Sequence, residues 1–307
     1  MSEEHPGHDH GGAALADQRG RLVAVLALTV AVLLVEVAGA VVSGSLALLA
    51  DAGHVLTDVA GLGMAVLAAV LSRRPATDAR TWGFRRAEVL AAAAQAAVLL
   101  AVGVLVLVEA VRRLFEPPGV TPAAMLAFGA AGLAGNLLAM GVLAGGRSAN
   151  LNTRAAFLEV VNDALGSVAV LLAAAVIART GWQRADAVAS LVIGALILPR
   201  TLRLLAESVN VLLESTPRGL DLGDVRRRLL AHPHVHDVHD LHATQVATGL
   251  PVVTAHVVVD DSCFYDGHLG VMLDELQREL DRDFDVEHST LQFEALSHAE
   301  HEHETHP

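Results

Sequence analysis

The 307-residue sequence contains no lysine, a single cysteine and few aromatic residues, which make up 3% of the chain. Arginine supplies all 21 positive charges and forms no basic patch in the acidic C-terminal region, which argues against nucleic-acid binding. One cysteine, Cys263, excludes an intrachain disulfide and a cysteine-rich zinc module. Acidic and histidine residues, not basic ones, precede the first apolar block, so the N-terminus does not resemble a secretory signal peptide.

Motifs of membrane metalloenzymes and hydrolases are also missing. The sequence has no His-Glu-x-x-His, no Gly-x-Ser-x-Gly elbow and no serine/lysine pair, and a catalytic zinc would need a general base beyond its ligands. We therefore expect a protein that is not an enzyme. Two other classes remain open at this point: a metal receptor that signals without transport predicts binding without flux, and a passive channel predicts flux independent of a pH gradient.

Hydrophobic residues make up 53% of the chain and gather in Ala, Val, Leu and Gly blocks up to about Leu205. Each block has roughly 20 residues, the length that crosses about 30 Å of hydrocarbon. Six spans are predicted, at 22–43, 47–71, 88–110, 123–144, 155–178 and 186–206. Eleven arginines lie in segments on the same side of the membrane as the N-terminus, and four lie in the loops on the opposite side. The positive-inside rule therefore predicts that both termini are cytoplasmic.

The region after Pro217 has no further apolar blocks and holds 18 Asp and Glu against six Arg, so it carries −12 of the net charge of −13. Periodicity predicts helices at 222–231 and 266–282 and strands at 236–246, 251–259 and 287–294. This αββαβ order indicates a small ferredoxin- or metallochaperone-like α/β domain, which would gain stability from a dimer partner or a bound metal.

The expected domains are a His-rich flexible tail (1–20), a six-helix transmembrane transport domain (21–210), a cytoplasmic metal-binding dimerisation domain (211–296) and a second His-rich tail (297–307). The tails interleave histidine with Glu, Asp and Gly and are too polar to fold. We interpret them as arms that gather metal weakly, in competition with protons.

Two predicted spans carry ionisable residues, although each charge inside a bilayer costs about 2.5–3.5 kcal/mol even on lenient scales. Asp51, His54 and Asp58 recur at i, i+3 and i+7 on one face of the second span, and Glu159 and Asp163 are four residues apart in the fifth. An ion pair joining helices would explain His54 and Asp58 alone. Four potential ligands in two i, i+4 pairs instead match tetrahedral coordination of a transition metal. Asp51 fits a proton relay or a carboxylate that orients His54.

Histidine is concentrated in the C-terminal region, where 12 of the 16 lie, eight of them within the predicted domain. On the last strand His288, Gln292 and Glu294 share parity and therefore one face, where they could meet His256 of a neighbouring strand. We expect metal binding at His239, His256 and Glu294. By contrast, the histidines that flank Pro233, at 232 and 234, are expected in a solvated loop.

These residues together resemble the cation diffusion facilitator family of metal/proton antiporters, over most of the chain. The similarity is carried by four stretches: Ser45 to Asp58, Arg86 to Ala91, Leu158 to Ser167 and Ser208 to Glu214. It is similar to the zinc-transporting branch, the one of cobalt-zinc-cadmium resistance proteins. The resemblance implies a homodimer in a bacterial-type plasma (inner) membrane that exports Zn²⁺, and also Co²⁺ or Cd²⁺, in exchange for protons by alternating access.

Carried over by position, the resemblance implies the transport ligands His54, Asp58, Glu159 and Asp163. It also implies ligands of a regulatory Zn²⁺ in the cytoplasmic domain, drawn from His239, His256, His268, Gln292 and Glu294. Glu159 stands where that branch usually has histidine, so the site offers one nitrogen and three carboxylates. This departure makes a manganese- or iron-selective exporter of the same family the alternative.

Overall fold

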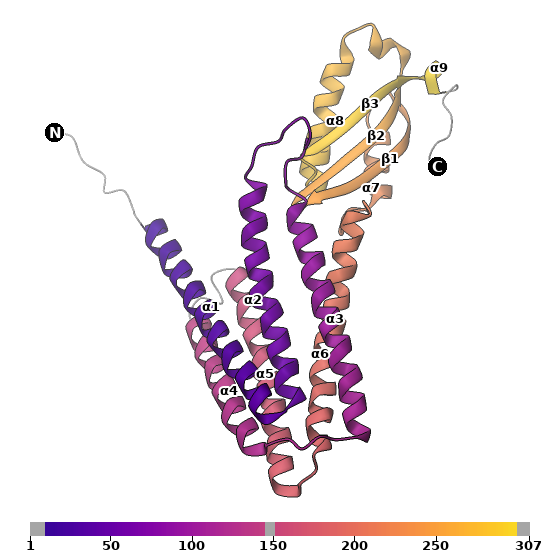
Figure 1. Ribbon diagram of the computed structural model, residues 1–307. Coiled ribbons are helices and arrows are strands. Elements are labelled where there is room, and N and C mark those ends of the chain that lie inside the picture. Colours follow the sequence, from indigo (N-terminus) through magenta and orange to yellow (C-terminus); the bar gives the residue numbers. More distant parts are fainter. Residues whose placement is uncertain (1–9, 145–150, 300–307) are drawn as a thin grey trace, which may run out of the picture. The chain divides into compact units, whose positions relative to one another are not determined.

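The computed structural model describes residues 10–144 and 151–299 (Figure 1). Its first part consists of six long helices: α1 (His10–Ser43), α2 (Leu46–Ser72), α3 (Ala87–Phe115), α4 (Pro122–Ala144), α5 (Leu151–Thr180) and α6 (Arg184–Leu212). All six of these described helices are long and apolar enough to cross a membrane. The prediction of six spans is therefore confirmed.

Parts of the two predicted tails, residues 1–9 and 300–307, lie outside the described residues. The first helix begins at His10, inside the segment expected as a tail, where Ala13, Ala14 and Leu15 favour helix formation. A short helix, α9 (Leu296–Ala299), likewise begins one residue before the expected second tail.

The chain divides into two compact units, one made of residues up to Gly63 with Ala94–Arg203, the other of Met64–Ala93 with the residues from Leu204 onward. In the first unit α1 packs on α4 and α4 packs on α5. Its core is built from small and branched side chains such as Leu48, while outward-facing side chains such as that of Leu105 are 69% exposed. Exposed aliphatic side chains on long apolar helices are expected where lipid, not water, is the solvent.

The second unit contains a three-stranded mixed sheet in the order β1-β2-β3, in which β1 is antiparallel to β2 and β3 is parallel to it. Its elements are α7 (Leu222–Leu230), β1 (Val235–Ala247), β2 (Leu250–Val259), the 3₁₀ turn η1 (Asp261–Phe264), α8 (His268–Phe284) and β3 (His288–Ala295). The predicted αββαβ order is confirmed, with each boundary within two residues of its expected position.

One face of this sheet is covered by helices. Leu229 of α7 and Met272 and Leu276 of α8 are fully buried against Val253 and Val257 of β2. Because side chains alternate along a strand, the neighbouring positions of β2 and β3 must point to the opposite face. That opposite face carries the polar residues described below.

Candidate metal centres

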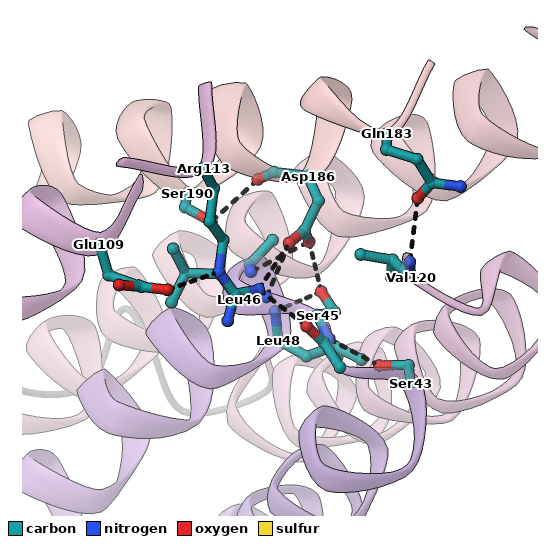
Figure 2. Close-up of polar contacts among 12 residues, drawn as sticks. Ser43, Ser45, Leu46, Leu48, Glu109, Arg113, Val120, Gln183, Asp186 and Ser190 are labelled. Atoms are coloured by element: carbon teal, nitrogen blue, oxygen red, sulfur yellow. Dashed lines mark hydrogen bonds and ion pairs between the residues drawn. The ribbon is translucent and has the colours of Figure 1, made fainter. Parts of the chain in front are cut away.

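Helix α2, which carries Asp51, His54 and Asp58, is fixed at its first turn by a carboxylate from another helix (Figure 2). Asp186 of α6 is 1% exposed and accepts hydrogen bonds from the Ser45 hydroxyl at 2.5 Å and the Leu46 backbone N–H at 2.7 Å. Arg113 of α3 lies 3.7 Å from the same carboxylate and donates to the Gly44 carbonyl at 2.8 Å. The first N–H groups of a helix have no intrahelical acceptor, so Asp186 caps α2 and anchors it to α6.

Three of the predicted transport ligands lie together inside the helix bundle. His54 Nε2 is 3.5 Å from Asp58 Oδ2 on α2 and 3.7 Å from Asp163 Oδ1 on α5, and one ligand atom of each residue lies within 4.8 Å of the others. The side chains of His54 and Asp163 are 8% and 5% exposed. His54 Nδ1 is buried and makes no hydrogen bond to any residue that the structure describes. Asp163 Oδ1 is likewise buried without a hydrogen bond to a described residue. One imidazole and two carboxylates, two of them with unsatisfied buried atoms, fit a divalent cation.

Asp51 lies on α2 about one helical turn before His54 and adds a further polar side chain next to this cluster. Its side chain is 2% exposed and accepts a hydrogen bond from Ser167 Oγ at 3.4 Å, and Asn136 of α4 donates to the same hydroxyl at 3.3 Å. A cavity of about 110 Å³ borders Asp51 and His54, with Arg200 in its wall. This volume has room for several water molecules beside the buried imidazole.

Glu159, the fourth predicted transport ligand, lies close enough to interact electrostatically with His54, Asp58 and Asp163, but it has a partner of its own. Its carboxylate is paired with Arg200 of α6 at 2.5 Å, and the Glu159 side chain is 27% exposed. The sequence suggested Arg200 only as one of the arginines that set orientation. Its role as the partner of Glu159 depends on contact between α5 and α6, which no local pattern reveals.

The second cluster lies on the open face of the sheet, where the register pairs His239 with His256 and His256 with Gln292. Glu294, 2% exposed, has its two carboxylate oxygens 3.1 Å from His239 Nε2 and 2.7 Å from His256 Nδ1. Gln292 Nε2 donates to the same carboxylate at 2.7 Å. The ligand atoms of the two histidines and Glu294 lie within 4.8 Å of one another, a nitrogen and oxygen set that suits Zn²⁺.

These contacts also set the charge of Glu294. Burial by itself raises the pKa of this carboxyl, but the hydrogen bond from Gln292 and the charges of His256 and His239 outweigh it, so the net pKa lies below its ordinary value of 4.5. Glu294 is thus held as a carboxylate, the form that binds metal.

Two other predicted residues of the domain lie apart from this cluster. The ring of His268, at the start of α8, is 5.4 Å from that of His234, and the ring of His288 is 4.9 Å from that of Trp82. His232 lies in a loop, as expected, but its side chain is only 7% exposed and lies 3.2 Å from Glu275, so the expectation that it is solvated is wrong.

Comparison with known proteins agrees with both parts of the fold. Residues 22–213 match the cation efflux transmembrane domain, and residues 217–296 match the cytoplasmic domain of cation efflux proteins. The chain therefore belongs to the cation efflux family, a family of transporters and not of enzymes. It is a multi-pass membrane protein of divalent metal cation efflux.

Three relatives illustrate the range of the family. The metal cation efflux system protein CzcD of Cupriavidus metallidurans is 42% identical over 287 residues, which cover 94% of this chain and 89% of that protein. The zinc transporter ZitB of Escherichia coli is 41% identical over 94% of this chain and 91% of its own length. A cadmium, cobalt and zinc/H⁺-K⁺ antiporter of Bacillus subtilis is 33% identical over 95% and 93%. A solved structure of the metal-bound C-terminal domain of the Cupriavidus CzcD transporter is 39% identical, covers 24% of this chain and 99% of that one, and has a TM-score of 0.22.

Proposed function

We propose that the protein is an antiporter that exports Zn²⁺, and also Co²⁺ and Cd²⁺, from the cytoplasm in exchange for protons. The observation that carries this proposal is the buried cluster of His54, Asp58 and Asp163, which two membrane-spanning helices supply. Ionisable groups inside a membrane-spanning bundle cost free energy unless an ion of opposite charge binds beside them. A dication that binds and leaves by alternating access is such an ion.

Glu159 is the fourth ligand in this proposal. Its carboxylate is held by Arg200, so it joins the metal only when the cation displaces the guanidinium. The exchange keeps a positive charge beside Glu159 in both states. Arg200 therefore acts as an internal counter-cation that reduces the repulsion among three acidic side chains while the site is empty.

Proton coupling follows from competition for the same atoms. Imidazole and carboxylate must lose their protons to bind metal, so a proton gradient can displace the cation on the far side of the membrane. Asp51, which accepts a hydrogen bond from Ser167 and borders the cavity beside His54, is the candidate relay for these protons. The name of the Bacillus relative, which includes protons among the exchanged ions, supports the coupling.

Zn²⁺ stands first because two of the relatives are called zinc transporters or zinc antiporters and because His54 supplies a nitrogen ligand. The cytoplasmic cluster of His239, His256 and Glu294 holds a regulatory Zn²⁺, while Gln292 orients the carboxylate. The domain of residues 211–296 also forms the homodimer. The Arg distribution supports a bacterial-type inner membrane orientation with both termini in the cytoplasm.

The test is metal uptake by inside-out vesicles with an imposed pH gradient, compared across zinc, cobalt, cadmium and manganese. We expect gradient-dependent zinc uptake that falls at least about tenfold in His54→Gln and is unaltered in the control His288→Gln, whose imidazole lies outside both clusters. Uptake that ignores the pH gradient would identify a passive channel. Binding without uptake would identify a receptor, and a manganese preference would reverse the proposed selectivity.

A further inference from the structure

A third group of imidazoles and a carboxylate lies where β1 begins and β2 ends. His234 Nδ1 is 2.8 Å from Asp260 Oδ2, and His236 Nε2 is 2.5 Å from Asp260 Oδ1. Each carboxylate oxygen therefore faces a different histidine. Neither His234 nor His236 belongs to the cluster around Glu294.

The backbone holds this group in place. Asp260 N donates to the His234 carbonyl at 3.1 Å, which ties the two segments together. His234 has a φ of 69°, a left-handed conformation that is uncommon for residues other than glycine. Asp260 stands at the N-cap position of η1, where aspartate ordinarily bonds to backbone N–H groups, yet its side chain makes no capping bond. Its carboxylate is directed to the two imidazoles instead.

A third imidazole lies next to this pair. The rings of His234 and His268 are 5.4 Å apart at 75°, close to the 5.1 Å and 72° between His239 and His256 in the cytoplasmic cluster. Two imidazoles that bind one tetrahedral zinc through bonds of about 2.0–2.1 Å have ring centres about 5 Å apart. The two histidine pairs thus share a geometry that suits a common metal ion.

The charge of the group also suits a cation. Hydrogen bonds from His236 and His234 hold the pKa of Asp260 below its ordinary value, so it is a carboxylate at neutral pH. A surface ion pair would need one histidine, and such pairs contribute about 0–1 kcal/mol at best. Two imidazoles on one carboxylate, with the ring of a third histidine beside one of them, are more than an ion pair requires.

We propose that His234, His236, His268 and Asp260 form a second metal site of the cytoplasmic domain, selective for dications that favour imidazole, such as Zn²⁺, Co²⁺ and Ni²⁺. Its side chains are more exposed than those of the Glu294 cluster, 46% for His234 and 45% for His236. The ligand atoms must close together by small side-chain rotations, which such exposure permits. The site therefore binds more weakly and exchanges faster than the Glu294 cluster. Metal binding at this site does not require that the protein transports metal.

The test uses the full chain in detergent and counts bound Zn²⁺ by equilibrium dialysis. We expect Asp260→Asn, His234→Gln and His236→Gln each to lose the same one equivalent, or to bind it at least about tenfold more weakly, while the control His288→Gln keeps the full count. With ¹¹³Cd²⁺ as the probe, the three variants lose one resonance, and Glu294→Gln loses a different one.

A full zinc count with unchanged affinity in either histidine variant, or a ¹¹³Cd spectrum of Asp260→Asn identical to that of the wild type, overturns the proposal. Melting curves in EDTA show whether each variant is folded. Loss of both resonances in all three variants would also count against a separate site, because it would mean that these residues only support the Glu294 cluster.

Discussion

The intramembrane cluster and the Glu294 cluster use the same residue types but hold them in different ways. His54 lies 3.5 Å and 3.7 Å from its two carboxylates, and its Nδ1 has no hydrogen bond to a described residue. Glu294, by contrast, has three side chains within 3.1 Å. The first cluster leaves buried polar atoms unsatisfied, whereas the second satisfies its central carboxylate without metal.

This difference suits two tasks. An undersatisfied site inside a membrane is stabilised by whichever cation arrives, a dication or protons, and so favours exchange between them. A carboxylate that is hydrogen-bonded to His239 and Gln292 and paired with His256 keeps its geometry when the metal leaves. Metal can therefore bind and leave there with little change in structure, which suits a site that senses metal concentration. We therefore expect transport to depend strictly on the first cluster and only in degree on the second.

The largest expected effect tests that contrast directly. Asp163→Asn removes a buried charge that the cation requires, and we expect zinc uptake by vesicles to fall about 100-fold. Glu294→Gln should lower uptake no more than a few-fold, because the transport ligands are intact. The surface change Asp274→Asn is the control. Equal losses in Asp163→Asn and Glu294→Gln would erase the distinction between the clusters.

The second prediction concerns what holds the intramembrane cluster in position. Asp186→Asn keeps an acceptor but removes the charge that caps α2 and faces Arg113, so we expect a loss of about 1–2 kcal/mol in stability. Asp221→Asn is the matched control, because Asp221 caps α7 at an exposed position and asparagine caps equally well. Thermal melting of the purified protein measures both, and equal melting temperatures would remove the anchoring role of Asp186.

Local patterns account for most of what the sequence predicted. Six apolar blocks gave six helices, and alternation gave the three strands. The intramembrane cluster was predictable because His54 and Asp58 are one helical turn apart and ionisable residues are rare in such spans. The pairing of His256 with Glu294 followed from strand parity, since residues of one parity share a face.

Contacts between distant elements were not predictable in the same way. Asp186 and Ser45 are separated by 141 positions, and their hydrogen bond depends on how α6 packs on α2. The ion pair of Glu159 with Arg200 and the convergence of His234 and Asp260 have the same origin. Sequence spacing identifies residues that share one face of a helix or strand, but it does not show which residues of two different elements lie opposite each other.

A smaller effect is expected at Glu159, where the sequence departs from the histidine of the branch it resembles. Glu159→His replaces oxygen by nitrogen and releases Arg200, so we expect zinc to be preferred over manganese by a further few-fold. Competitive vesicle uptake of both metals measures the change. The double variant with Arg200→Gln separates the new ligand from the freed guanidinium. Unaltered selectivity and an unaltered pH profile in both variants would show that residue 159 does not contact the metal.

The smallest effect concerns the metal-free cytoplasmic domain. Glu294 has a lowered pKa in the folded protein, so its charge stabilises the fold above the ordinary value of 4.5, and this contribution is lost as the pH falls through the lowered pKa. Between pH 5 and pH 6 the free energy of unfolding of Glu294→Gln should therefore be lower than that of the wild type by about 1 kcal/mol or less, which lowers its melting temperature. The difference should vanish toward pH 3. The exposed change Glu287→Gln is the control, measured in EDTA with the full chain. A difference that grows as the pH falls would mean that burial, and not the surrounding Gln292, His256 and His239, dominates the charge of Glu294, and the cytoplasmic cluster would then resemble the intramembrane one.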